Sequence, residues 1–162
     1  MALRNKRGRM AQNLAIAVPA LLLAGAYISQ YVFGLHPCEM CWWQRWPHFI
    51  ALGLALLVTQ LQISRPLILL AAVAIAVSGL IGVFHAGVEY DWWEGITGCA
   101  TLERTGGSAL DDIMAAPITR CDQAAFRFLT ISMAGWNAII SLGGAVLIWA
   151  LLPKNGPGRG LR

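Results

Sequence analysis

Four long runs without a charged side chain constrain this chain more than any other feature of its sequence. No Asp, Glu, Lys or Arg occurs in the intervals 10–38, 46–64, 66–88 and 128–153. The shortest interval, 46–64, would be about 28 Å long as a helix, close to the roughly 30 Å of a bilayer hydrocarbon core. Only 12 % of the residues are charged and 57 % are hydrophobic, which leaves no polar shell for a soluble fold. The sequence therefore predicts an all-α membrane protein.

We expect a single domain over residues 1–162, folded as an antiparallel bundle of four transmembrane helices. The predicted helices are about 14–33, 46–63, 67–88 and 128–152. The predicted connections on the outer side are loops at about 34–45 and 89–127, and the tail at about 153–162, rich in Gly and Pro, is predicted to be disordered. The first apolar run is longer than the core of a cleaved signal peptide, so we expect it to be retained.

The distribution of charge predicts the orientation in the membrane. Basic residues without any acidic neighbour occupy both termini and the tight turn at Arg65, whereas all eight acidic residues lie in the two longer loops. An excess of Lys and Arg marks the cytoplasmic side. Both termini are therefore predicted to be cytoplasmic, and the net charge of +4 is a topology signal and not a nucleic-acid-binding surface.

Four cysteines lie in the two outer loops, in two pairs. Cys38 and Cys41 form a C-x-x-C motif, and Cys99 and Cys121 lie in the long loop. A C-x-x-C motif occurs in zinc sites and redox sites alike. The second pair lacks the spacing of a zinc knuckle, and an oxidising outer compartment favours disulfides, so we predict no metal. Two inert structural disulfides remain an alternative to redox-active pairs.

Two ionisable residues are predicted to lie at similar depth near the C-x-x-C motif. Arg45 follows Cys41 by four residues, and if the helix begins early enough Cys41, Arg45 and His48 share one face. His85 lies one turn below the outer end of the third helix. Arg45 could instead snorkel to lipid headgroups, and His85 could be a packing residue. Beside a reactive thiol, both would suit a quinone, whose carbonyl oxygens need hydrogen bonds and whose reduced form needs protons.

Other patterns are structural. Small residues are predicted to allow close helix approach at Ser78, Gly79, Gly82, Gly135, Gly143 and Gly144. A short amphipathic helix on the membrane surface at about 108–116 and an ordinary loop turn remain equally open.

The sequence resembles the DsbB family of disulfide bond formation membrane proteins over nearly its whole length. The resemblance rests on the run CEMCWWQR at 38–45, on the segment from His85 to Cys99, on Cys121, and on SMAGWN at 132–137. The first of these runs is far more specific than a C-x-x-C motif alone.

The resemblance implies a thiol:quinone oxidoreductase that supports protein disulfide bond formation. Such proteins reoxidise a soluble thioredoxin-like dithiol oxidase, DsbA, and pass its electrons to membrane quinone. It therefore implies a DsbA-like partner, ubiquinone or menaquinone as the acceptor, and contact with the lipid bilayer but not with nucleic acid. It also implies a multi-pass protein of the bacterial inner membrane whose cysteines face the periplasm.

The resemblance also assigns roles to the cysteines. It implies two redox-active disulfides, Cys38–Cys41 and Cys99–Cys121. The partner would attack the second disulfide at Cys99, and Cys121 would then attack Cys38 and release Cys41 as a thiolate that faces the quinone.

Arg45 looks like the family's quinone-binding residue, which also stabilises the Cys41 thiolate, and His85 resembles its second quinone-side residue. Two other functions are weighed against this one. A non-catalytic scaffold would hold two structural disulfides. A relative of the vitamin K epoxide reductases would carry its C-x-x-C motif at the start of the last core helix, whereas here the motif precedes the second.

Overall fold

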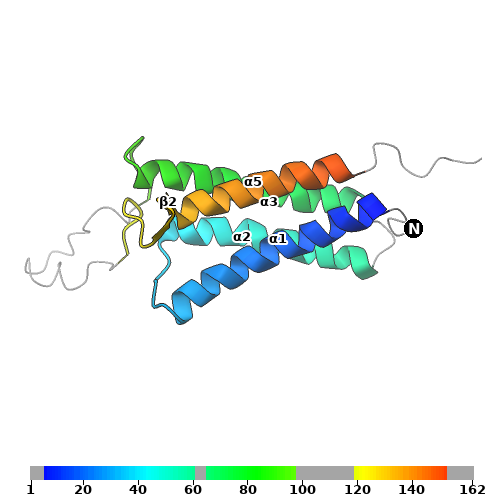
Figure 1. The fold of residues 1–162 in the computed structure, drawn as a ribbon, viewed down its shortest axis with the longest axis horizontal. Coiled ribbons are helices and arrows are strands. Elements are labelled where there is room, and N and C mark those ends of the chain that lie inside the picture. Colours follow the sequence, from blue (N-terminus) through cyan, green and yellow to red (C-terminus); the bar gives the residue numbers. More distant parts are fainter. Residues whose placement is uncertain (1–5, 61–64, 98–118, 153–162) are drawn as a thin grey trace, which may run out of the picture.

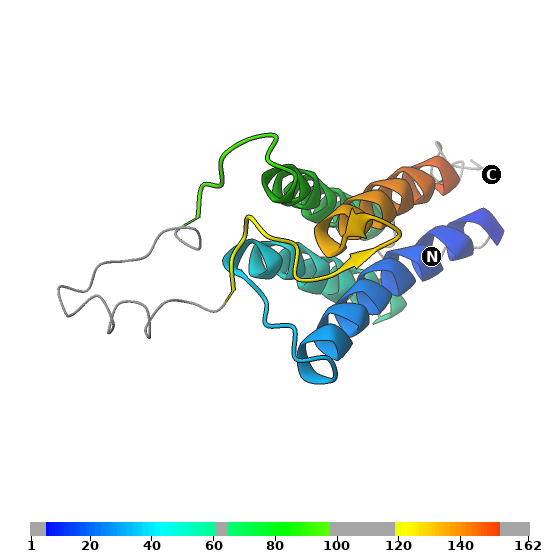
Figure 2. The same ribbon diagram turned by 60° about the vertical axis from the view of Figure 1, so that its left-hand side comes forward.

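The computed structural model describes residues 6–60, 65–97 and 119–152. Four helices run side by side and alternate in direction, with a small hairpin at one end of the bundle (Figures 1 and 2). The helices are α1 (Lys6–Tyr31), α2 (Glu39–Gln60), α3 (Arg65–Glu89) and α5 (Met133–Leu151). The strands β1 (Arg127–Phe128) and β2 (Ile131–Ser132) pair antiparallel just before α5. The predicted helical architecture is confirmed.

Local sequence explains two of the helix ends near the hairpin. The backbone N–H of Trp92 donates to the Gly87 carbonyl oxygen at 2.8 Å, and Asp91 adopts a φ of 56°. This is a Schellman motif that closes α3. At the start of α5, Ser132 Oγ accepts the Gly135 backbone N–H at 3.1 Å, as a helix N-cap does.

Small side chains fill the interior, and large apolar side chains cover the outside. The main core cluster, at the end of the bundle away from the hairpin, contains Ala11, Ala15, Val18, Ala51, Ala55, Val58, Ile68, Ala71, Ala72, Ile75, Ala145, Ile148 and Leu152. Leu21, Ile50, Leu80 and Trp149, one on each helix, are 72 %, 56 %, 60 % and 72 % exposed. Apolar surface on the outside of every helix is what a lipid environment requires.

Glycines bring the helices close together, as predicted. A Cβ on Gly82 of α3 would lie 3.0 Å from the Ala134 carbonyl oxygen of α5, and one on Gly144 would lie 3.0 Å from Val18 of α1. Gly143 is different, because among the described residues a Cβ there would meet nothing within 4 Å. The prediction that Gly143 serves close packing is therefore wrong.

Three of the described helices, α1, α3 and α5, are long and apolar enough to cross a membrane. Over its described residues α2 does not reach that criterion, so four membrane spans are not confirmed. The helix begins at Glu39 and not at about Trp46, and the added turns carry the polar residues Glu39, Gln44 and Arg45. The predicted loop at 34–45 is correspondingly shorter.

Other boundaries also differ from the prediction. α1 begins at Lys6 and not at about 14, and α5 begins at Met133 and not at about 128 because the hairpin occupies the intervening residues. The predicted surface helix at 108–116 and the predicted disordered tail at 153–162 lie outside the described residues.

Candidate active site

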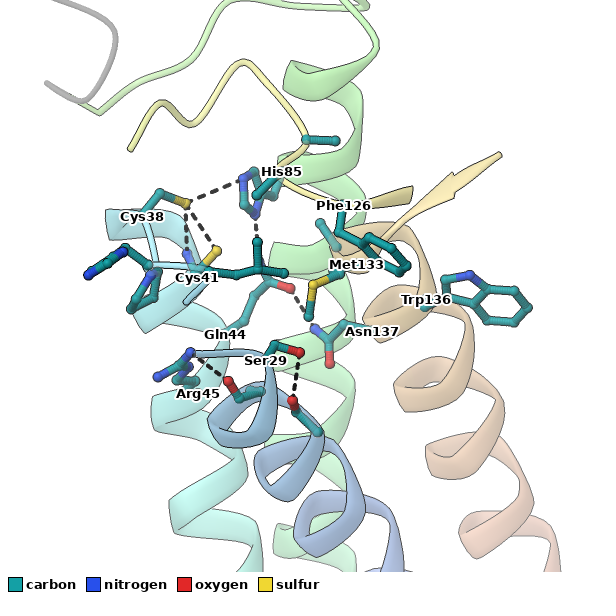
Figure 3. A pocket seen from close by; sticks show the side chains of 18 of the residues that line it. Ser29, Cys38, Cys41, Gln44, Arg45, His85, Phe126, Met133, Trp136 and Asn137 are labelled. Carbon is teal, nitrogen blue, oxygen red and sulfur yellow. Dashed lines mark hydrogen bonds between the residues drawn. The ribbon is translucent and has the colours of Figure 1, made fainter. Parts of the chain in front are cut away.

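A cavity of about 580 Å³ lies at the hairpin end of the bundle, lined by all four helices and the segment 119–128 (Figure 3). Its lining includes four residues that the sequence singled out, Cys38, Cys41, Arg45 and His85. His48 also lines it, so Cys41, Arg45 and His48 do share one face of α2. Its apolar walls include Leu21, Leu22, Phe126, Met133 and Trp136.

Cys38 and Cys41 lie at the first turn of α2 with their sulfurs 3.1 Å apart. Cys38 directly precedes the helix, and its Sγ accepts the Cys41 backbone N–H at 3.4 Å. The Cys38 thiol donates a hydrogen bond to Cys41 Sγ, and this bond together with burial raises the pKa of Cys38. Cys38 therefore keeps its proton, and Cys41 is the sulfur placed to carry negative charge. Both are thiols here, so the Cys38–Cys41 disulfide stays a prediction.

Cys121 reaches the C-x-x-C pair from the other outer segment. It is 1 % exposed and lies in one buried cluster with Cys38 and Met40. Its sulfur accepts a hydrogen bond from Thr97 Oγ1 at 3.3 Å. The proximity of Cys121 and Cys38 is what exchange between the two pairs requires. Cys99 lies outside the described residues, so its pairing stays a prediction.

The Arg45 side chain is held inside the bundle by α1. It is 6 % exposed, and its guanidinium donates to Gln30 Oε1 at 2.7 Å and to the Ala26 carbonyl oxygen at 3.3 Å. The guanidinium carbon lies 5.1 Å from the centre of the Tyr27 ring and 4.9 Å from that of Trp42. The alternative that Arg45 snorkels to lipid headgroups is therefore wrong.

His85 connects the sulfur pair to the interior of the bundle. Its side chain is 2 % exposed, and its Nε2 lies 3.6 Å from Cys38 Sγ and 3.7 Å from Glu89 Oε1. Its Nδ1 lies 2.7 Å from Gln44 Nε2. His85 therefore contacts the Cys38 sulfur, and its quinone-side role stays a prediction.

Polar contacts continue from Gln44 into the bundle, as Figure 3 shows for Gln44 and Asn137. Asn137 bonds Gln44 at 2.8 Å and His48 at 2.9 Å, and Ser78 and Ser141 complete the network. Sequence reasoning did not assign Gln44, Ser78, Asn137 or Ser141 to the site. The signal that could have found them is a polar side chain inside an otherwise apolar helix.

Three possible metal ligands meet at the site. The ligand atoms of Cys38, Cys41 and His85 lie within 4.8 Å of one another. Zinc takes such ligands in structural sites, usually four of them. The expectation of no metal stays a prediction.

Comparisons with known proteins identify the family to which the chain is similar. Residues 8–151 match the family described as disulfide bond formation protein DsbB. The chain is 28 % identical to Disulfide bond formation protein B of Marinobacter nauticus, over 88 % of this chain and 94 % of the relative. It is 24 % identical to the uncharacterized protein RP370 of Rickettsia prowazekii, over 94 % of each chain. No solved structure matches the chain significantly. Because the family match extends from α1 to the end of α5, this multi-pass membrane protein belongs to the DsbB family of disulfide bond formation proteins.

Proposed function

We propose that the chain is a membrane thiol oxidase that reoxidises a DsbA-like dithiol oxidase and transfers the electrons to membrane quinone. Membership of the family implies disulfide bond formation by a membrane oxidase. The observation that carries the finer proposal is one cavity in which Cys41, Arg45 and His85 meet, beside the buried cluster of Cys38 and Cys121.

The residues around the cavity suit a quinone. Leu21, Phe126 and Met133 offer apolar walls to a flat ring and its hydrocarbon tail, Arg45 offers N–H groups of the kind that carbonyl oxygens accept, and His85 lines the same cavity. When bound, a quinone accepts two electrons and two protons. Ubiquinone and menaquinone both have two ring carbonyls, so the proposal includes either.

The sulfur atoms of the chain carry the electrons by exchange. The partner's thiolate attacks Cys99, which breaks the Cys99–Cys121 bond and leaves Cys121 as a thiolate. Cys121 then attacks Cys38, which forms a Cys38–Cys121 bond and releases Cys41 as a thiolate. The partner's second thiol, whose proton passes to Cys38, attacks the partner–Cys99 bond, so the partner leaves oxidised and Cys99 is freed as a thiolate. Cys99 then attacks Cys121, which re-forms the Cys99–Cys121 bond and leaves Cys38 as a thiol beside the Cys41 thiolate. The burial of Cys121 beside Cys38 supports the second exchange. Arg45 and the amino-terminal end of α2 stabilise the negative charge on Cys41.

The proposal includes a topology. We place the chain in the bacterial inner membrane, with α2 as a fourth span, both termini in the cytoplasm and the cysteines facing the periplasm. The charge distribution supports this orientation, because the acidic residues and cysteines that the structure describes lie at the hairpin end, whereas Lys6, Arg7 and Arg9 lie at the other end of the bundle.

Quinol formation tests the electron path. Membranes that contain the protein are mixed with a reduced DsbA-like oxidase and a short-chain ubiquinone analogue, and the absorbance of the quinone is followed. Wild type is expected to form quinol, and Cys41→Ser is expected to abolish turnover because no thiolate then faces the acceptor. Normal turnover in Cys41→Ser would remove the proposed path.

Trapping provides the control for the partner. A partner oxidase without its resolving cysteine is expected to become disulfide-linked to wild type and not to Cys99→Ser, as seen on a non-reducing gel. A scaffold with inert disulfides would give neither quinol nor a linked product.

A further inference from the structure

The hydrogen bonds around Gln44 and Asn137 determine which nitrogen of His85 carries a proton. A side-chain amide can be rotated to exchange its oxygen and nitrogen, and a neutral imidazole can carry its proton on either nitrogen. The donors and acceptors in a row of such groups are therefore fixed only where one of them contacts an atom that can act solely as an acceptor or solely as a donor. Backbone carbonyl oxygens have a single role, because they accept hydrogen bonds and never donate them. The carbonyl oxygens of Met40 and Ser78 contact the two side-chain amides that lead to His85.

Met40 sets the orientation of the Gln44 amide. Gln44 Nε2 lies 3.2 Å from the Met40 carbonyl oxygen, so this atom must be the amide nitrogen. Its second hydrogen points to His85 Nδ1 at 2.7 Å, and Gln44 Oε1 accepts from Asn137 Nδ2 at 2.8 Å. His85 Nδ1 is therefore an acceptor without a proton, and the proton of the neutral ring is on Nε2.

Ser78 sets the orientation of the Asn137 amide in the same way. Asn137 Nδ2 lies 3.2 Å from the Ser78 carbonyl oxygen. Its Oδ1 accepts from Ser141 Oγ at 3.1 Å and lies 2.9 Å from His48 Nε2, which therefore donates. Rotating the Asn137 amide by a half-turn would place its oxygen against the Ser78 carbonyl oxygen and its nitrogen against the Ser141 hydroxyl donor. Gln44, His48, Ser78 and Ser141 are all less than 8 % exposed, so bulk water cannot replace these bonds.

We propose that Gln44 and Asn137 are positioning residues that hold His85 as a neutral imidazole with its proton on Nε2. In this state His85 donates an N–H to the Cys38 sulfur at 3.6 Å and has no lone pair with which to accept a proton from it. His85 therefore acts on Cys38 as a hydrogen-bond donor and not as a base.

Neighbouring charged groups do not change the assignment of the proton to His85 Nε2. The titratable and charged groups around His85 are Cys38 and Cys41 of α2, Glu89 of its own helix, and Cys121 and Arg127 from the segment before α5. The Glu89 carboxylate, 3.7 Å from Nε2, would favour a positive ring. A positive ring would require a proton on Nδ1, which would face the Gln44 N–H in a buried site and lose that hydrogen bond.

The consequence for the reaction rests on the proposed function. Forming the Cys38–Cys41 bond from the Cys38 thiol and the Cys41 thiolate releases two electrons and one proton. The electrons go to the quinone, which takes up that proton and a second one from solvent. Because His85 cannot accept the proton of Cys38, this proton leaves along the hydrogen bond from Cys38 to Cys41 and from there to the quinone.

Nitrogen NMR of the histidine rings tests the inference without relying on turnover. The full-length protein is labelled with ¹⁵N-histidine in lipid nanodiscs, and a His85→Gln variant assigns one of the three histidine signals. In wild type, His85 is expected to have a bare Nδ1 and a protonated Nε2 from about pH 5.5 to about pH 8. A proton on Nδ1 of His85 in wild type would overturn the proposal.

Gln44→Glu replaces the N–H that faces His85 with a carboxylate oxygen. A proton is then expected on both ring nitrogens at about pH 6, because Nδ1 gains an acceptor. Gln12→Glu makes the same change on α1 at the far end of the bundle and is expected to keep the wild-type signal. An unchanged His85 signal in Gln44→Glu would contradict the role of Gln44 in positioning the His85 proton. If Gln44→Glu does not fold, the wild-type signal decides the question alone.

The pH profile of quinol formation distinguishes this inference from the proposed function. The ratio of Gln44→Glu to wild-type rates is expected to change at least about threefold between pH 6 and pH 8, and the Gln12→Glu ratio is expected to stay constant. If wild type forms quinol but carries a proton on His85 Nδ1, the positioning of His85 by Gln44 and Asn137 is wrong and the proposed function stands. The expected NMR signals without turnover in any protein would overturn the proposed function alone. If both nitrogens of His85 are protonated in Gln44→Glu but the ratio of its rate to the wild-type rate does not change with pH, His85 does not act on Cys38 as proposed.

Discussion

At the scale of single residues, Cys38 and Cys41 are chemically distinct although they lie in the same helical turn. Cys38 is 6 % exposed and donates a hydrogen bond to Cys41, whereas Cys41 lines the cavity and is half-buried. The hydrogen bond to Cys41 and burial raise the pKa of Cys38, so its thiolate forms only at a pH above the usual range for cysteine.

Alkylation of the reduced protein measures this difference. Because the thiolate is the nucleophile, iodoacetamide is expected to modify Cys41 at least about tenfold faster than Cys38 at pH 8. The rate at Cys38 is expected to keep rising above pH 9. Mass spectrometry of quenched samples gives both rates, and faster modification of Cys38 than of Cys41 would contradict the assignment of the proton.

Arg45 is expected to be sensitive to replacement even by lysine. Only a planar guanidinium can bond Gln30 and Ala26 of α1 while stacking on two aromatic rings. Arg45→Lys is therefore expected to raise the quinone concentration for half-maximal turnover about tenfold, which corresponds to about 1.4 kcal/mol. Arg9→Lys, at an exposed position on the opposite end of α1, is the matched control. An unchanged quinone dependence in Arg45→Ala would leave Arg45 with a packing role only.

At the scale of helices and strands, the end of α3 contains a strained residue. Asp91 occupies the left-handed position of the Schellman motif with a φ of 56°, where glycine is normally found. Asp91→Gly is expected to stabilise the protein by about 1 kcal/mol, measured by thermal unfolding in detergent. Asp91→Ala removes the same carboxylate but keeps the strained backbone, so it is not expected to stabilise. Equal stability of the two variants would show that the carboxylate, and not the backbone angle, is responsible.

The start of α2 is the helix boundary that carries the C-x-x-C motif and Arg45. The charged residues Glu39 and Arg45 kept residues 39–45 out of the predicted helix, but Cys38 caps the helix and the side chains of Gln44 and Arg45 are buried. The early start places both sulfurs and Arg45 on one rigid element. A loop could not hold them in fixed register with His85.

At the scale of the whole molecule, the contact between α3 and α5 places Ser78 and Gly82 against Asn137. Gly82 allows this contact, because an added Cβ would lie 3.0 Å from the Ala134 carbonyl oxygen and 3.1 Å from the Ala138 backbone nitrogen. Backbone atoms cannot move aside by themselves, so a methyl group there must separate the two helices.

Gly82→Ala is expected to destabilise the protein by about 1–3 kcal/mol, because the packed helices must shift. Gly143→Ala is the matched control, since its Cβ would meet nothing within 4 Å among the described residues and alanine favours the helix. Thermal unfolding followed by circular dichroism measures both variants. Equal stability of Gly82→Ala and Gly143→Ala would show that the close approach of α3 and α5 contributes nothing to stability.

Much of the architecture could be predicted from the sequence, because hydropathy and charge act locally along the chain. The charge-free intervals predict the helices, and the cysteines of both loops were expected at one end of the bundle. The family resemblance also identified Arg45 and His85 as candidates. The hairpin at 127–132 was not foreseen, because strands of two residues leave no recognisable period.

The sequence alone determined that this chain is a helical membrane protein with a cysteine pair at the mouth of a helix, since apolar runs of this length have few other stable forms. Only the tertiary structure decided the hydrogen-bond partners. Gln44 meets His85 across 41 positions and Asn137 across 93, and Arg45 meets Gln30 on another helix. Such contacts depend on the rotation and depth of each helix, which helix packing sets and hydropathy does not record.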